Sequence, residues 1–312
     1  MLYKKVVTVK SIYTPYKPRI SQFYDFRFIY KGVPISVGQG GKLKIFTESE
    51  YMQGRIPDVA DFAAAMADFD EVLCDLLPEP VIGAIRYGST VRSDWSLASD
   101  IDYFVVIADL SAESPIAEAV QRAWKEYAVT LEVRVLTMEM AQSGRHGVDG
   151  PFAAHLASIT QFSIGENPVQ YIAPTGRDWH EECKLTLERY LRKLTNDQTL
   201  LCATEVDDAR IIKRILDKPV HAMRVMVQFD RGVGTALSSR AEIVAAYRET
   251  SFGSLAALLL PLEKARQQYL QLLQERTDNP AELERYREVQ QRMRNCYPAA
   301  RLFVQENLLR MR

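Results

Sequence analysis

The sequence predicts an α/β core with a mixed sheet, followed by an all-α helical bundle and preceded by a small β-rich extension. Three observations support this prediction. Strand-like apolar runs alternate with helical periodicity between residues 57 and 136, helical periodicity alone follows after about residue 176, and the first fifty residues combine aromatic alternation with glycine turns. The chain has 312 residues, enough for two ordinary domains. We expect the extension at residues 1–55, the core domain at 56–175 and the helical domain at 176–312.

The extension has the pattern of a small sheet or a pair of hairpins. Residues 24–30 and 42–46 alternate as strands do, and residues 31–34 and 38–41 supply glycine and proline for turns. Residues 1–45 hold nine basic residues and one acid, which gives +8 within a chain of net charge −1. This asymmetry suits a nucleic-acid partner, and it equally suits an ordinary sheet whose lysines protect an exposed edge.

Helices and strands alternate in the core. Apolar residues at spacings of three and four predict an amphipathic helix over residues 57–77, and a second helix over 114–127 has Pro115 in its first turn. Three apolar runs predict strands at residues 81–87, 100–107 and 129–136.

Helical periodicity continues without a strand pattern in the second half of the chain. We expect helices at residues 179–194, 207–216, 220–229, 241–247, 255–273, 281–293 and 299–309. The boundary with the core lies between residues 172 and 177, where Ala-Pro-Thr-Gly interrupts the pattern. The apolar stripe at residues 255–273 is explained most simply as core packing.

A pair of aspartates, Asp100 and Asp102, is the sharpest chemical feature. Side chains alternate along a strand, so both carboxylates point to one face and Ile101 points to the core. Two neighbouring carboxylates stay ionised together when a cation lies between them, and Mg²⁺ commonly combines one or two carboxylates with substrate phosphates. Gly88 and Ser89 end the preceding strand, where a glycine admits a phosphate and a helix start or hydroxyl can hold its oxygens.

A third carboxylate and an arginine extend this pattern. Glu132 and Arg134 point to one side of the strand at residues 129–136. An adjacent strand would bring Glu132 beside the aspartates, either as a further metal ligand or as the base that takes a proton from an attacking hydroxyl. Arg92, one turn beyond Ser89, would neutralise charge on a departing pyrophosphate.

These residues resemble the signature of the DNA polymerase β-like nucleotidyltransferase superfamily. The elements of that signature are Gly88-Ser89, the Asp-Ile-Asp triplet that starts at Asp100, and an acid on a later strand. The stretch around Glu132 is similar to the base-carrying strand of aminoglycoside nucleotidyltransferases. The chain departs from many members at residues 93–96, which lack a glycine soon after the arginine.

The resemblance extends into the helical half and covers about residues 57–234. The segment Lys218-Pro-Val-His221-Ala-Met-Arg224, followed by Arg231-Gly-Val-Gly234, resembles a helix of bacterial and phage members that packs over the nucleotide. It implies that Lys218 and His221 contact the nucleotide.

The resemblance also implies a reaction and a cofactor. The expected activity is Mg²⁺-dependent transfer of a nucleoside monophosphate from a nucleoside triphosphate such as ATP to an acceptor hydroxyl, with release of pyrophosphate. The acceptor stays open among an RNA 3′ end, a small molecule, a protein hydroxyl and another nucleotide, and the oligomeric state is equally open. We expect the active site between the sheet and the helical bundle.

Two other functions remain in view. The chain would be a catalytically silent nucleotide- or RNA-binding module of antitoxin type if the acids had only structural roles. Arg214 and His221, separated by six residues, resemble the R-x(4–6)-H motif of HEPN-type ribonucleases, which predicts metal-independent RNA cleavage.

The composition of the chain indicates the class of protein and its cellular location. Hydrophobic residues make up 47% of the chain and charged residues 25%, which is ordinary for a globular protein. The sequence has no apolar stretch long enough to span a bilayer. Its four cysteines are scattered without a C-x-x-C pair, so we expect a cytoplasmic protein without a zinc site.

Overall fold

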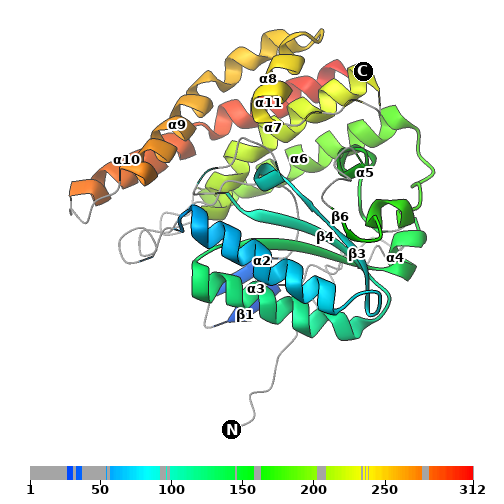
Figure 1. Cartoon of the computed structure of the whole chain (residues 1–312). Coiled ribbons are helices and arrows are strands. Elements are labelled where there is room, and N and C mark those ends of the chain that lie inside the picture. Colours follow the sequence, from blue (N-terminus) through cyan, green and yellow to red (C-terminus); the bar gives the residue numbers. More distant parts are fainter. Residues whose placement is uncertain are drawn as a thin grey trace.

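The computed structural model describes residues 27–30, 33–36, 54, 57–91, 96, 99–144, 146–157, 163–201, 209–232, 235, 237, 239–275 and 281–311. Within these ranges a four-stranded sheet is covered by helices on both faces, and a bundle of helices follows it in the chain (Figure 1). The predicted α/β core with a mixed sheet and helical second half is therefore confirmed.

A short antiparallel hairpin precedes the core. Strand β1 (Arg27–Tyr30) pairs with β2 (Val33–Ser36), and Tyr30 is the register partner of Val33. The sequence placed Val33 and Pro34 in a turn, which is wrong, because only two residues separate the paired strands. The strand predicted at residues 42–46 lies outside the described residues.

The core sheet has the order β5 (Leu131–Thr137), β4 (Ile101–Ile107), β3 (Val81–Tyr87) and β6 (Ser163–Gly165). β4 and β5 are parallel, whereas β3 is antiparallel to both of its neighbours. The three long strands lie where the apolar runs predicted them. The sequence missed β6, because three residues are too few to show the period-two alternation of a strand.

Two helices, α2 (Val59–Asp75) and α3 (Glu113–Tyr127), lie side by side across one face of the sheet (Figure 1). α2 begins at a capping box in which the Asp58 carboxylate accepts the Asp61 N–H and the Asp61 carboxylate accepts the Asp58 N–H, each at 2.9 Å. Phe62 and Phe69 pack from α2 into a core with the inner side chains of β3, β4 and β5. Full burial of such a side chain stabilises the fold by ~1.5–3 kcal/mol.

Shorter elements cover the opposite face. α4 (Met138–Gln142), α5 (Gly150–Ala157) and the 3₁₀ turn η4 (Pro168–Tyr171) enclose a second core that includes Phe104 of β4.

His146 fixes the loop between α4 and α5, because its Nε2 donates to the Ala173 carbonyl at 2.7 Å while its Nδ1 accepts the Val148 N–H at 3.0 Å. This pattern requires a neutral imidazole. Burial, the largest influence, lowers the pKa of His146, although the hydrogen bond to Ala173 acts in the opposite direction.

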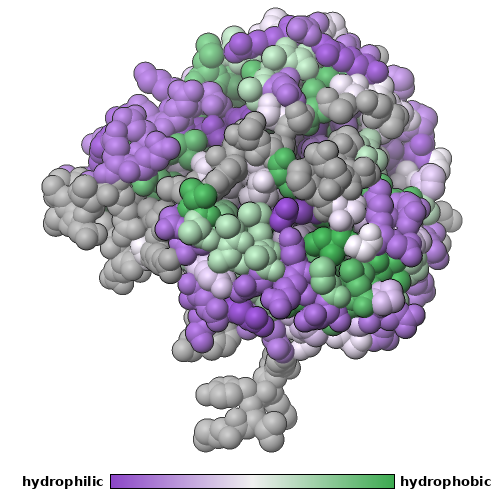
Figure 2. Space-filling model, in the orientation of Figure 1, coloured by the Kyte–Doolittle hydropathy of each residue, from purple (hydrophilic) through white to green (hydrophobic). Residues whose placement is uncertain are grey.

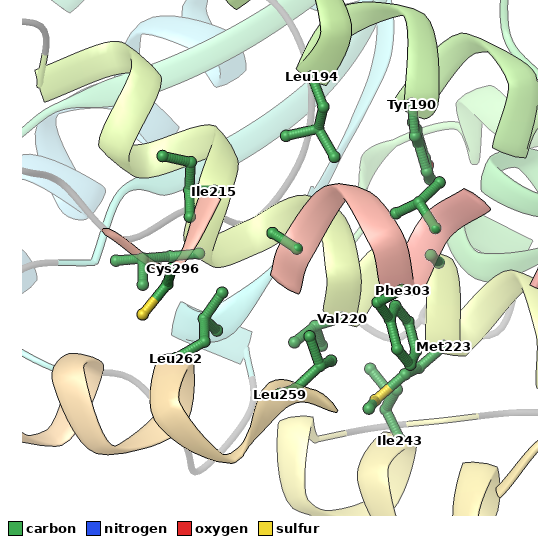
Figure 3. Packing of buried hydrophobic residues seen from close by; sticks show 14 of the residues in the cluster. Tyr190, Leu194, Ile215, Val220, Met223, Ile243, Leu259, Leu262, Cys296 and Phe303 are labelled. Atoms are coloured by element: carbon green, nitrogen blue, oxygen red, sulfur yellow. The ribbon is translucent and has the colours of Figure 1, made fainter. Parts of the chain in front are cut away.

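The second half of the chain is helical throughout its described residues. Its elements are α6 (Trp179–Leu201), α7 (Ala209–Arg231), α8 (Arg240–Arg248), η5 (Gly253–Leu259), α9 (Leu260–Gln274), α10 (Ala281–Asn295) and α11 (Tyr297–Arg310). α7 contacts α6, α8, α9, α10 and α11 and forms the centre of the bundle. Leu194 of α6, Ile215 and Met223 of α7 and Phe303 of α11 belong to one buried cluster (Figure 3).

Two helix predictions need correction. The helices predicted at residues 207–216 and 220–229 form one helix, α7, which continues through Pro219. Proline removes one backbone donor and normally interrupts a helix, but both halves of α7 are buried in the same core. The helix predicted at residues 255–273 is instead a 3₁₀ segment, η5, followed by α9, and Pro261 lies at the start of α9, where a missing N–H is tolerated.

The bundle contacts the face of the sheet that carries α5. The Trp179 indole N–H donates to the Gln228 carbonyl at 2.9 Å, and the Gln228 amide donates to the Pro151 carbonyl at 3.3 Å. Figure 2 shows a largely hydrophilic surface over α9 and α10. None of the helices in the described ranges combines the length and apolar character needed to cross a bilayer.

Candidate active site

The register of the sheet brings the predicted carboxylates together. Asp102 of β4 is the register partner of Tyr87 on β3 and of Glu132 on β5, so the three residues form one row across the sheet. Asp100 precedes Asp102 by two residues and therefore points to the same face. The three acids are at most 3% exposed, so none of them is a solvated residue at the end of a strand. Ile101 points into the core against α2 and α3, as predicted.

A tight turn fixes the start of β4. Ser96 and Ser99 bond to each other in both directions: the Ser96 N–H donates to the Ser99 Oγ at 2.9 Å and the Ser99 N–H to the Ser96 carbonyl at 2.8 Å. The Ile101 N–H then donates to the Thr130 carbonyl at 3.0 Å, which ties the chain to β5. Asp100 is therefore held between two fixed points of the backbone.

The backbone of Gly88 lies close to the Asp102 carboxylate because glycine has no side chain. Its φ is +83°, and a Cβ at this position would lie 2.1 Å from the Asp102 Oδ2. Left-handed backbone favours glycine, and a Cβ at this position would require the Asp102 carboxylate to move. The predicted need for glycine at residue 88 therefore has two physical reasons.

Residues beyond Gly88 differ in part from the prediction. Among the described residues, Ser89 begins a 3₁₀ turn, η1 (Ser89–Val91), and not an α-helix. The Oγ of Ser89 and the Oγ1 of Thr90 are buried, and neither has a hydrogen-bond partner among the described residues. A hydroxyl group can donate one hydrogen bond and accept others. Arg92 lies outside the described residues.

The structure adds a lysine that sequence reasoning missed. Lys213 of α7 donates a hydrogen bond to the Asp100 Oδ2, and its Nζ lies 4.0 Å from the Glu132 Oε2. Burial lowers the pKa of Lys213, but the charges of Asp100, Glu132 and Asp217 more than offset this effect and hold the pKa above its usual value. Lys213 is therefore a permanent cation at the centre of the acids.

Asp217 adds a fourth carboxylate one helical turn beyond Lys213 and is 5% exposed. Lys213 thus lies near three buried carboxylates, those of Asp100, Glu132 and Asp217. Charge interactions in such a buried setting are strong, because a low local dielectric strengthens them.

The chemistry of these side chains fits Mg²⁺, which prefers hard oxygen ligands and takes one or two carboxylates together with substrate phosphates and water. Asp100 and Asp102 supply that number of carboxylates, and the Asp102 carboxylate lies directly against the backbone of Gly88. Among the residues that the structure describes, no group of three or more His, Cys, Asp and Glu side chains is arranged as a metal site. The set of three ligands that includes Glu132 stays a prediction.

A small pocket adjoins the acids on the same face of the sheet. It has an empty volume of about 350 Å³, part of it open to solvent, and is lined by Arg134, Asp149, Phe152, Tyr190, Lys218, His221 and Arg224. The two predicted nucleotide contacts, Lys218 and His221, thus lie together in this pocket. They lie further along α7 than Lys213, which contacts the acids.

A signal for Lys213 and Asp217 exists in the sequence. Lys213, Asp217 and His221 recur every four residues in a helix whose other positions are mostly apolar. A polar stripe inside a buried helix indicates a functional face. The prediction of two separate helices around Pro219 concealed this stripe.

Comparison with protein families identifies one match. Residues 66–149 match the family model described as a nucleotidyltransferase domain. This range contains β3, β4 and β5 with Gly88, Ser89 and the acids of the central row. No curated protein matches the chain.

Proposed function

Because residues 66–149 form a nucleotidyltransferase domain of the DNA polymerase β-like superfamily, we propose that the protein transfers a nucleoside monophosphate from a nucleoside triphosphate to an acceptor hydroxyl. The observation that supports this proposal best is the group of buried acids, Asp102 and Glu132 with Asp100, beside the end of β3 at Gly88. A purely structural role would not require several carboxylates to be buried together at considerable electrostatic cost.

Asp100 and Asp102 would hold Mg²⁺ in this reaction. Bound Mg²⁺ would neutralise charge on the triphosphate and on the α-phosphate as it reacts. The hydroxyls of Ser89 and Thr90 would donate to oxygens of the β- and γ-phosphates, and Arg92 would balance charge on the departing pyrophosphate.

Glu132 is the proposed base. It would accept the proton of the acceptor hydroxyl as the new O–P bond forms and the bond between the α-phosphorus and the bridging oxygen breaks, so that pyrophosphate leaves. Lys213 would keep the carboxylates of Asp100 and Glu132 in place through its hydrogen bond to Asp100 and its ion pair with Glu132. Positioning and charge neutralisation would provide most of the rate enhancement.

The test is transfer of label from each nucleoside triphosphate labelled at the α-phosphate, with Mg²⁺ and with RNA, protein or small-molecule fractions of a cell extract as acceptors. Wild-type protein is compared with the Asp100→Asn/Asp102→Asn double variant. We expect label transfer by wild type alone and Mg²⁺-dependent binding of the triphosphate in calorimetry. Absence of both would overturn the proposal and favour a silent binding module.

The ribonuclease hypothesis has a separate test. It requires RNA cleavage without metal that is abolished by His221→Ala. His221 lines the pocket with Lys218 and Arg224, an arrangement that suits ligand binding equally well. Intact RNA after incubation with wild-type protein would exclude the ribonuclease hypothesis. We place the proposed reaction in the cytoplasm, as the cysteine pattern predicts.

A further inference from the structure

Lys213 shares a partner with the ion that the proposed function requires. Its ammonium donates a hydrogen bond to the Asp100 Oδ2, and its Nζ lies 4.0 Å from the Glu132 Oε2. Asp100 is also a proposed ligand of Mg²⁺ and is 1% exposed. The Asp100 carboxylate is thus a partner for two cations, the ammonium of Lys213 and a divalent ion.

Two cations on one buried carboxylate repel each other. Mg²⁺ binds oxygen at about 2.1 Å, and a charge-assisted hydrogen bond from nitrogen to oxygen is about 2.8 Å long. On the same carboxylate oxygen the two cations would therefore lie at most about 5 Å apart. The low dielectric of a buried site strengthens their repulsion. The charge of Lys213 therefore opposes binding of a divalent ion at Asp100.

Asp217 gives the ammonium a second partner on its own helix. Lys213 and Asp217 are four residues apart on α7, so their side chains lie on one face of the helix. Asp217 is 5% exposed. Burial lowers the pKa of Lys213, and the neighbouring carboxylates, Asp217 among them, raise it. The flexible four-carbon stem of a lysine allows Lys213 to exchange Asp100 for Asp217 while the backbone of α7 stays in place.

We propose that Lys213 and the divalent ion are alternative partners of Asp100, and that the ammonium turns to Asp217 when the ion binds. The inference rests on the metal site of the proposed function. Lys213 holds Asp100 and Glu132 in place before the ion arrives, and the ion takes over this task at Asp100.

The exchange predicts the form in which the ion enters the site. An ion alone meets the charge of Lys213 and should bind weakly. An ion chelated by a nucleoside triphosphate brings negative charge with it, which offsets this repulsion. The ion should therefore enter together with the nucleotide, and the affinity for metal without nucleotide is the property that Lys213 controls.

The first test is Mn²⁺ binding by the full-length protein without nucleotide, measured from the electron paramagnetic resonance signal of the free ion. Mn²⁺ takes oxygen ligands as Mg²⁺ does. Lys213→Met should bind Mn²⁺ about 5- to 150-fold more tightly than wild type, the range expected for coupling between two ligands. Lys213→Arg retains the charge and should stay near wild type. Lys184→Met, at an exposed lysine of α6, removes the same charge elsewhere and should leave the affinity unchanged.

A double-mutant cycle tests the exchange with Asp217. Asp217→Asn should weaken Mn²⁺ binding at least about 5-fold while Lys213 is present, because the ammonium loses its second partner and stays at Asp100. In the Lys213→Met background the same change should have a much smaller effect. An equal effect in both backgrounds would show that Asp217 acts on the ion directly and would overturn the exchange.

The remaining outcomes separate this inference from the proposed function. Equal Mn²⁺ affinity of wild type and Lys213→Met, including absence of binding by both, would overturn the exchange even if nucleotidyl transfer is observed. A gain in affinity that survives Asp100→Asn would overturn it as well, whereas a gain that Asp100→Asn removes would support it even if no nucleoside triphosphate donates label. Unchanged or tighter Mn²⁺ binding by Asp217→Asn would also overturn it, and this result does not require Lys213→Met to fold.

Discussion

Lys213→Met removes a cation that lies among the acids. The Lys213 ammonium bonds to Asp100 and lies 4.0 Å from the Glu132 carboxylate. At an effective dielectric constant of about 20, a pair at 4.0 Å is worth roughly 4 kcal/mol before desolvation is counted. Removing one partner of a buried ion pair typically destabilises a protein by ~3–5 kcal/mol. We therefore expect the free energy of unfolding to fall by about 3–5 kcal/mol.

The measurement is urea unfolding of wild type, Lys213→Met and Lys184→Met, each with a chelator and again with Mg²⁺. Lys184 is an exposed lysine of α6 and serves as the matched control. Mg²⁺ should stabilise Lys213→Met more than wild type, because the ion replaces the lost positive charge. A ligand at 100 times its dissociation constant stabilises by about 2.7 kcal/mol.

Two results would refute this reasoning. If Lys213→Met were as stable in chelator as Lys184→Met, the ammonium would not be compensating the buried carboxylates. If Mg²⁺ stabilised wild type and Lys213→Met equally, the ion and the lysine would not act on the same group of acids.

Three further predictions concern single residues. Gly88→Ala should weaken Mg²⁺-dependent triphosphate binding at least about 10-fold, because its Cβ would displace Asp102; Gly176→Ala has similar strain at φ +76° but open space around the Cβ, and an equal loss there would contradict the argument. The pKa of His146 is lower in the folded protein than in the unfolded chain, where it is about 6.5. The contribution of His146 to the free energy of unfolding should therefore be complete above this pH and decline as the pH falls below it. Urea unfolding at about pH 7.5 and 5.5 should show a decline in stability for wild type and a smaller decline for His146→Gln. An equal decline in both proteins would exclude His146 as its source. Tyr103→Phe should reduce stability by about 1.5 kcal/mol, since its hydroxyl donates to a carboxylate of α2 at 2.5 Å; nucleotidyl transfer should be unaffected, and lost activity in a stable variant would contradict the assignment of Tyr103 to the opposite face of the sheet.

Local periodicity was enough for most of the core. The three long strands, α2 and α3 lie where alternation and helical spacing predicted them, because these patterns reflect which side chains each element buries. The prediction failed where local rules compete with packing. Pro219 indicated a break between two helices, but burial of both halves in one core keeps α7 continuous.

The same distinction applies to the candidate site. The Asp-Ile-Asp triplet places Asp100 and Asp102 on one face by alternation alone, and Gly88 indicates a sharp turn before them. That Glu132 would join them was a prediction from a resemblance and from the neighbouring strand pattern, and the register of β4 and β5 confirms the adjacency. The roles of these residues in catalysis stay predictions.

Sequence patterns alone predict the fold class, the shared face of the aspartates and the resemblance to nucleotidyltransferases. These properties depend on residues within a few positions of one another or on the repeat of a single element. The hydrogen bond of Lys213 to Asp100, 113 positions earlier, and the shared pocket of Arg134 and Lys218 are visible in the folded chain alone. The polar stripe of α7 indicates a functional face, but which strand this face meets depends on how the whole bundle packs on the sheet, and no local pattern encodes that packing.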